Sequence, residues 1–239
     1  MQLLSVGLAR SIWLFDMNQL NPGGKSIFPD SLIWLGEKYS FQTFPKALAD
    51  LDKEKKGFLF TAGEFHADSG PITVNLSIYN DGLVAETWAS TEKGDSFLED
   101  ALRSVSGRHG LVIPPVMRKQ YVSELTIKLD NPIPSSNDPL IEAFCRKLDR
   151  LFESHGLPPF EFNGMGFSVD ASRSSYKPPG LSIERKLGVD FSLNQYWSKS
   201  AFQTKDHLFA LEEFEKLIAA MNSRLAAASP MPVPKAWGT

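Results

Sequence analysis

Hydrophobic and polar residues alternate most regularly in one stretch before the middle of the chain. Every second residue from 72 to 78 is aliphatic, and the residues between them are polar. A period of two is typical of a β-strand with one buried face. Asn80-Asp81-Gly82 follows, and Asp-Gly tolerates the positive φ angles of a tight turn, so we expect residues 83–89 to return antiparallel. The register stays open, because a three-residue loop ending at Gly82 would shift every pair by one.

A helix is predicted directly after this hairpin, because the hydrophobic period changes. Its apolar stripe recurs at i, i+3, i+4 and i+7, namely at Leu98, Ala101, Leu102 and Val105. Ser96 followed by Glu99 fits a capping box, and Asp95 is a competing N-cap. Gly110 supplies a left-handed residue at the C-terminal end, with Leu111 folding back onto the last turn.

Further strands are expected from alternation or from apolar runs, at residues 3–15, 39–44, 57–66, 121–129, 160–170 and 181–185. Residues 21–24 predict a turn. Residues 32–35 fit either a short helical turn or a strand. Residues 189–203 are aromatic and polar and show no dominant period.

Two more amphipathic helices are predicted in the second half of the chain. Asp138 and Pro139 open the first, whose stripe is Ile141, Phe144, Cys145, Leu148, Leu151 and Phe152. Thr204 caps the other, whose stripe is Leu208, Leu211, Phe214, Leu217, Ile218 and Met221. His-Gly-Leu occurs at 109–111 and again at 155–157, each time after a helix, and shared C-cap chemistry explains this more economically than an internal duplication.

These elements predict an α+β fold. We expect a single domain over residues 1–225, with a mainly antiparallel sheet and two or three helices packed on one side. Residues 226–239 are of low complexity and rich in proline, which is typical of a disordered tail or of residues added for expression.

Composition narrows the class of protein. The formal net charge of the 239 residues is -3, and this lack of a basic excess disfavours nucleic acid as the main partner. The single cysteine excludes an intramolecular disulfide and favours a reducing compartment. The N-terminus lacks the pattern of a signal peptide, and no apolar run reaches the roughly 20 residues that span a bilayer. We therefore expect a cytoplasmic protein without a membrane partner.

The chain carries no catalytic or cofactor signature. It has no Gly-rich phosphate loop, nucleophile elbow, HExxH, EF-hand loop or paired CxxC, so no cofactor is expected. Glu64, His66 and Asp68 alternate along a strand end and are a weak metal candidate, although a polar strand end running into solvent explains them more simply.

The histidines and the cysteine do not indicate catalysis either. His109 and His155 each lie in the last turn of a predicted helix, where a cation favours the helix dipole. His207 lies in the first turn of the last helix and has no evident partner in the sequence. Cys145 lies on an apolar stripe, where a free cysteine behaves as a small hydrophobe.

Aromatic and cationic residues gather in the irregular segment before the last helix. Arg185, Lys186, Tyr196 and Trp197 combine the residue types that anchor protein interfaces, and packing of these aromatics onto the sheet is an equally good explanation. Trp34 is a further candidate for partner binding.

Two functional hypotheses follow. The first is a non-enzymatic cytoplasmic protein that binds another protein, such as a bacterial-type immunity or accessory protein that neutralises a toxin domain, and a homodimer is compatible with it. The second is a hydrolase-type enzyme whose site is assembled from dispersed carboxylates, namely Glu64, Asp68, Asp81, Glu86 and Asp95.

Overall fold

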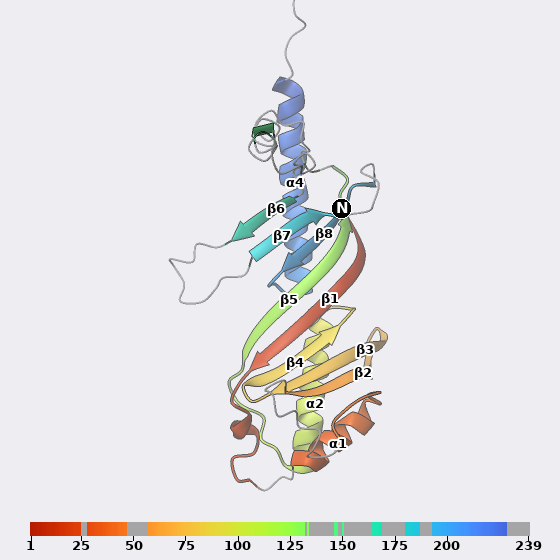
Figure 1. Ribbon diagram of the computed structural model, residues 1–239, viewed down its shortest axis with the longest axis vertical. Coiled ribbons are helices and arrows are strands. Elements are labelled where there is room, and N and C mark those ends of the chain that lie inside the picture. Colours follow the sequence, from red (N-terminus) through yellow and green to blue (C-terminus); the bar gives the residue numbers. More distant parts are fainter. Residues whose placement is uncertain are drawn as a thin grey trace, which may run out of the picture.

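The computed structural model describes residues 1–24, 28–46, 57–131, 164–168, 180–186 and 193–228, together with positions 133, 146, 147 and 150. Within these residues the chain forms one antiparallel sheet with helices packed against it (Figure 1). The predicted α+β class is therefore confirmed. The helix expected after Asp138, with Cys145 and His155, lies outside the described residues.

The helices and strands have the following bounds. The helical segments are η1 (Met17–Leu20), α1 (Phe28–Lys38), α2 (Thr91–His109) and α4 (Thr204–Ala228). The strands are β1 (Gln2–Leu14), β2 (Phe58–Ala67), β3 (Gly70–Tyr79), β4 (Gly82–Thr87), β5 (Arg118–Lys128), β6 (Gly164–Ser168), β7 (Gly180–Arg185) and β8 (Gln195–Ser200). No described helix is long and apolar enough to cross a membrane.

The sheet order is symmetric about its centre. The strands lie in the order β2-β3-β4-β1-β5-β8-β7-β6, so the long strands β1 and β5 pair in the middle and a three-strand meander flanks each of them (Figure 1). We refer to β1–β4 with α1 and α2 as the first half, and to β5–β8 with α4 as the second half. In each half one long strand is followed by a meander and then by a helix. The strand order thus shows a structural repeat that the sequence pattern alone did not support.

The predicted hairpin is confirmed, and its register is now defined. Tyr79 pairs with Gly82 and Ile78 with Leu83, so the connecting residues are Asn80 and Asp81. Gly82 has a φ of +152°, and a Cβ at this position would lie 2.1 Å from the carbonyl oxygen of Trp13. Glycine is required here because β1 passes directly beside the turn.

Helix α2 begins one and a half turns before the predicted start. The N-cap is Ser90, whose hydroxyl accepts a hydrogen bond from the N–H of Lys93, and not Ser96 or Asp95. Ser96 instead bonds back to the carbonyl of Glu92 within the helix. The C-terminal prediction is confirmed, since Gly110 is left-handed and its N–H bonds to the carbonyl of Ser106.

The segment 39–44 is not the strand that its alternation indicated. Only an isolated bridge joins Thr43 to Thr61 of β2. Ser40 adopts a positive φ of 51°, which breaks the extended path while Tyr39 and Phe41 remain buried. The period of two in this segment reflects two aromatic rings entering the core from an irregular chain.

Two apolar cores lie between the helices and the sheet. The core of the first half is centred on Phe97 of α2, whose ring makes edge contacts with Tyr39 at 5.0 Å and Phe65 at 5.6 Å. The core of the second half is built from β5, β7, β8 and α4 and includes Leu125, Ile183, Leu211 and Ile218. One continuous sheet therefore carries both cores.

The second half departs from the sequence prediction at two places. Residues 189–203 were expected to be irregular, yet β8 is a regular strand whose Tyr196, Ser198 and Ser200 are buried. Aromatic and polar residues on both faces hid its period of two. Residues 226–228 belong to α4 and not to the predicted tail.

The two halves are joined at the starts of their helices. The N–H of Thr91 donates to the hydroxyl of Thr204 at 3.0 Å, and the N–H of Thr204 donates to the hydroxyl of Thr91 at 2.8 Å. Both threonines are buried. This reciprocal pair satisfies one free N–H at the start of each helix and fixes the two helices relative to each other.

Candidate binding surface

All described helices pack on one face of the sheet, and none covers the other (Figure 1). In β1, Ala9, Ser11 and Trp13 are buried against the helices, and the residues between them point to the opposite side. We call this opposite side the open face. Its central residues are Leu8, Arg10, Ile12 and Leu14 of β1, Val84 and Glu86 of β4, Gln120, Val122 and Glu124 of β5, and Trp197 and Lys199 of β8.

The centre of the open face is apolar. Ile12 of β1 pairs with Val84 of β4, and Val122 of β5 pairs with Arg10 one step further along β1. These aliphatic side chains are neither fully buried nor fully exposed. An antiparallel sheet with one free face normally carries polar residues there. An apolar centre in place of a polar one is typical of a surface that another molecule covers.

Two ion pairs flank this apolar centre. Arg10 bonds to Glu86 across β1 and β4, and the Lys199 ammonium lies 2.8 Å from Glu124 across β5 and β8. Cross-strand pairs of opposite charge stabilise the sheet locally. The Nε of Arg10 is buried and has no acceptor among the described residues, which leaves one donor at the centre of the face without a partner.

A groove adjoins the apolar centre in the second half. It has a volume of about 540 Å³ and runs over β6, β7 and β8 beside Val122. Gly166 and Gly180 lack side chains, and Ser182 and Lys199 supply polar groups at its wall. The open face is therefore hollowed on one side of its centre.

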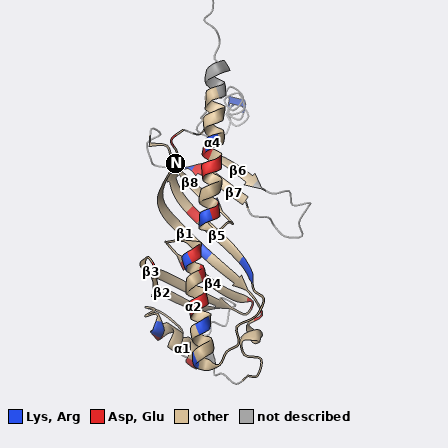
Figure 2. Cartoon of the chain, turned by 180° about the vertical axis from the view of Figure 1, so that it is seen from behind, with Lys and Arg blue, Asp and Glu red and all other residues tan. Residues whose placement is uncertain are grey.

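The two cations beside the apolar centre of this face are engaged within the sheet. Phosphate recognition needs cations that are free to replace counterions. The two cations that flank the apolar centre, Arg10 and Lys199, are already paired with carboxylates. On the helix side, acidic and basic residues are interspersed along α2 and α4 (Figure 2).

The structure brings four of the five predicted partner-binding residues together at the ends of β7 and β8. Arg185 pairs with Tyr196, and the N–H of Lys186 bonds to the carbonyl of Gln195. Tyr196 is 2% exposed, and its hydroxyl accepts from the N–H of Ile133 at 3.0 Å. Trp197 is the member of this group that lies on the open face.

Trp34 lies apart from this group, on α1 in the first half. Its ring makes an edge contact with His109 at 5.6 Å, and the Lys38 ammonium lies 5.8 Å from the ring centroid. His109 thus packs against an aromatic ring at the end of α2, where the sequence placed it. Its Nε2 is buried without a partner among the described residues.

One pattern in the sequence does indicate the open face. Residues 8–14 of β1 are apolar on both faces of the strand, because Leu8, Ile12 and Leu14 alternate with Ala9 and Trp13. A strand with this pattern is covered on both sides. The run was interpreted only as a first strand, so its outward residues were not considered as a site.

The weak metal candidate consists of exposed side chains. His66 Nε2 lies 3.1 Å from Glu64 Oε1 on β2, and both side chains are more than half exposed. Asp68 lies beyond the end of the strand. Within the described ranges, no three His, Cys, Asp or Glu side chains are close enough to hold one ion.

The dispersed carboxylates of the enzyme hypothesis lie in different parts of the structure. Glu86 is on the open face, whereas Asp95 lies between α2 and the sheet and bonds to Trp13. Asp81 is in the β3–β4 turn, and Glu64 is at the far end of β2. The described residues therefore do not form an acid–base pair from this set.

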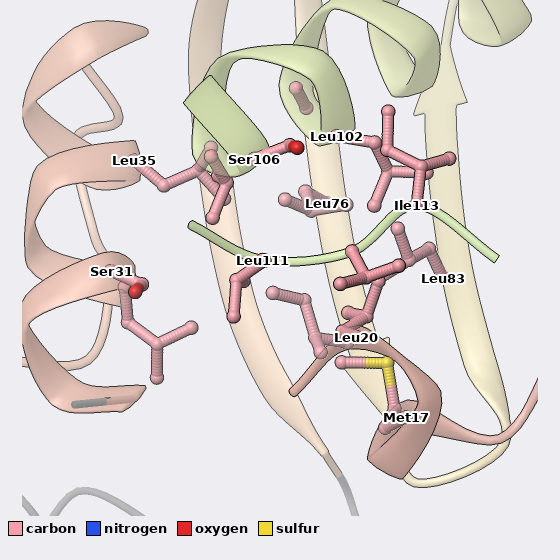
Figure 3. Close-up of a pocket in the computed structure, with 15 residues that line it drawn as sticks. Met17, Leu20, Ser31, Leu35, Leu76, Leu83, Leu102, Ser106, Leu111 and Ile113 are labelled. Carbon is pink, nitrogen blue, oxygen red and sulfur yellow. The ribbon is translucent and has the colours of Figure 1, made fainter. Parts of the chain in front are cut away.

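An apolar cavity lies within the first half, between α1, α2 and the sheet (Figure 3). Leu20, Leu35, Leu76, Leu102 and Leu111 point into it, and Ser31 and Ser106 are its only hydroxyl-bearing lining residues. Its volume is about 40 Å³. Ligand pockets usually occupy roughly 300–1,000 Å³, so we interpret this cavity as a packing gap in the core.

Comparisons with known proteins define no family. No family model matches the chain, and no curated protein matches it. Among solved structures, the chain is similar to Methanococcus jannaschii TBP, with 12% sequence identity, a TM-score of 0.42, and coverage of 92% of this chain and 98% of that one. A similarity at this level assigns no function to the chain.

Proposed function

We propose that this protein is a non-enzymatic binding protein that engages another protein through the open face. The observation that carries this proposal is the apolar centre at Ile12, Val84 and Val122 on the side of the sheet that no described helix covers. Contiguous apolar surface rimmed by polar groups is typical of protein interfaces.

The charges favour a protein over a nucleic acid as the partner. Arg10 and Lys199 are paired with carboxylates within the sheet, so the part of the face around the apolar centre offers little net positive charge to a phosphate backbone. Trp197 adds an aromatic side chain beside the second ion pair, and such side chains anchor many protein interfaces.

The specific form that we carry forward is an immunity or accessory role, in which binding neutralises a partner such as a toxin. A mildly acidic chain with one cysteine and without catalytic motifs fits this role. The identity of the captured partner decides between this form and another binding role.

Site-directed photo-crosslinking in the cell that makes the protein tests the proposal. A photoreactive phenylalanine analogue is placed at Ile12 or at Val122 on the open face, and at Arg103 as a matched control on the solvent side of α2. We expect one discrete protein adduct from positions 12 and 122 and none from position 103, with the partner identified by mass spectrometry.

The purified partner then gives a quantitative test. Ile12→Thr keeps a β-branched residue in the strand and removes apolar surface, and we expect the affinity to fall about tenfold, the loss of roughly 1.4 kcal/mol. Arg103→Ala is expected to bind as the unmodified protein does. The proposal would be overturned by equal adducts from the open-face positions and from position 103, by crosslinking to nucleic acid, or by the absence of any adduct from the open face.

A further inference from the structure

The second half contains a buried histidine that the proposed function does not use. His207 lies in the first turn of α4 and is completely buried. Its Nδ1 is 2.6 Å from the hydroxyl of Ser123 on β5, and its Nε2 is 2.8 Å from the hydroxyl of Ser198 on β8. Both serines are also completely buried. The ring therefore ties the start of the helix to two neighbouring strands.

The hydrogen bonds define which nitrogen carries the proton when this ring is neutral. The Ser198 hydroxyl donates its single proton to the carbonyl of Ser182 on β7, at 2.8 Å. Since that proton is in use, Nε2 of His207 donates to Ser198, and Nδ1 accepts from the Ser123 hydroxyl. A single ordered chain of hydrogen bonds thus runs from β5 through α4 to β8 and β7, with the imidazole neutral.

Among the described residues, no hydrogen bond or ion pair joins the His207 ring to a charged group. On the helix side of the sheet, the titratable or charged groups nearest along these strands are Tyr121 of β5, Tyr196 of β8 and Arg185 of β7, and each of the two phenol hydroxyls has a hydrogen-bond partner of its own. The α2 carboxylates are also engaged, since Glu92 accepts from the N–H of Lys205 and Asp95 accepts from Tyr121. Asp206, beside His207 on α4, is exposed.

The equivalent position in the first half carries no titratable group. Gly94 is three residues beyond Thr91, as His207 is three residues beyond Thr204, and Gly94 packs directly on Ser11 and Ala85. Ser11 bonds to the carbonyl of Thr91. The two halves therefore hold their helices on the sheet by different means.

We infer that His207 makes the second half acid-sensitive: protonation places a charge among hydroxyls that cannot neutralise it, and the start of α4 separates from β5 and β8 while the first half stays closed. Ser123 can turn its hydroxyl to accept a proton from Nδ1, so the cost of protonation is the buried charge itself and not a lost hydrogen bond.

The direction and range of this effect follow from burial. Burial lowers the pKa of His207 from 6.5 to about 4. The contribution to stability is present above the unfolded value and is lost as the pH falls from about 6.5 towards 4. Opening of the second half is therefore expected to increase about 20-fold between pH 7 and pH 5.

Hydrogen exchange measured by mass spectrometry on the full chain tests the inference, because the first half is an internal control. After correction for intrinsic exchange rates, protection of α4, β7 and β8 is expected to fall about 20-fold from pH 7 to pH 5. Because separation of α4 also releases the Thr91–Thr204 bonds at the start of α2, the control is the rest of the first half, and protection of β3, β4 and the C-terminal turns of α2 is expected to change far less. In His207→Asn the difference between the halves is expected to disappear, whereas His66→Asn, at an exposed histidine, is expected to retain it.

Nuclear magnetic resonance of ¹⁵N-histidine-labelled protein gives a second test that needs no variant. At pH 7 the His207 ring is expected to be neutral with its proton on Nε2. A protonated His207 ring at pH 7 would contradict the inference. In the exchange experiment, the inference would be contradicted by an equal loss of protection in both halves, or by unchanged protection of the second half at pH 5.

Discussion

Asp95 connects helix α2 to both central strands. The variant Asp95→Asn tests how much this connection contributes to the free energy of unfolding. Its Oδ1 accepts from the indole N–H of Trp13 on β1 at 2.7 Å, and its Oδ2 accepts from the hydroxyl of Tyr121 on β5 at 2.9 Å. The Lys119 ammonium lies 3.6 Å away. Asparagine has nearly the same shape, but one of its two acceptors becomes an NH₂ group that faces a donor.

The expected cost follows from these contacts. A hydrogen bond to a charged group contributes roughly 1.5–3 kcal/mol, and a buried donor left without a partner costs roughly 1–3 kcal/mol. The Asp95 side chain is 14% exposed and Trp13 is 1% exposed, so water cannot readily replace the lost acceptor. Asparagine still offers its oxygen to one of the two donors. We therefore expect the free energy of unfolding to fall by about 2 kcal/mol.

Urea denaturation followed by far-ultraviolet circular dichroism measures this change. Glu99→Gln is the matched control, because Glu99 lies on the same helix at the same 3.6 Å from Lys119 but is 54% exposed. We expect that control to change the free energy by less than about 0.5 kcal/mol. A double-mutant cycle with Tyr121→Phe is expected to give a coupling energy of about 1 kcal/mol. Two results would contradict this prediction: a loss for Asp95→Asn no larger than that for Glu99→Gln, or strict additivity of Asp95→Asn with Tyr121→Phe.

Three further predictions concern turns, core packing and alkaline pH. Gly82→Ala is expected to lower the melting temperature, because its Cβ would lie 2.1 Å from a carbonyl oxygen of the neighbouring strand. Gly107→Ala, in α2 with open space around it, is expected to raise the free energy of unfolding by about 0.5–1 kcal/mol. Equal effects of the two variants on stability would contradict this prediction. Leu111→Ala, at a buried residue that lines the existing cavity, is expected to lower the free energy of unfolding by about 2–5 kcal/mol in urea denaturation. Val116→Ala, at an 81% exposed side chain of the same loop, is expected to lower it by less than about 0.5 kcal/mol, and comparable losses for the two variants would contradict this prediction. Burial, and then the hydrogen bond to a carboxylate, raises the pKa of Tyr121 to about 12. The contribution of Tyr121 to stability is therefore lost as the pH rises from 10 to 12. Over that range the urea midpoint of Tyr121→Phe should fall less than the midpoint of the unmodified protein.

Local patterns predicted the elements that depend on near neighbours. The hairpin around Gly82 and the apolar stripe of α2 follow from periods of two and 3.6, and both are confirmed. The predicted start of α2 was wrong, because Ser96 and Glu99 match the sequence pattern of a capping box although they lie within the helix. The true start depends on Ser90 and on the distant Thr204, which bonds to the first turn across the molecule.

Features that depend on contacts between residues far apart in the chain could not be predicted from local sequence patterns. Segment 39–44 alternates like a strand, but Ser40 turns the chain out of the extended path. His207 had no visible partner because Ser123 and Ser198 reach it from two strands. The open face was missed for the same reason, since Ile12, Val84 and Val122 become neighbours only when β1 pairs with both β4 and β5. Arg185, Lys186, Tyr196 and Trp197 lie together at the ends of β7 and β8, as their closeness in sequence favours, and their role in partner binding stays a prediction.

The strand pair β1–β5, which we call the seam, suggests how a chain of this kind could evolve and where it can be divided into fragments. Each half has its own meander, its own core and at least one helix, and the halves meet along the β1–β5 strand pair, at the Thr91–Thr204 contact and through contacts of α2 with the second half, such as Asp95 with Tyr121 and Glu92 with Lys205. A chain containing one half alone would expose its long strand as a sheet edge, which pairs readily with another edge. Two copies of such a half-length chain could therefore rebuild the same strand order about a true twofold axis, as closed dimers do. By the same reasoning, cleavage between α2 and β5 should yield two fragments that reassociate, so the seam is the natural place to divide the protein for fragment complementation.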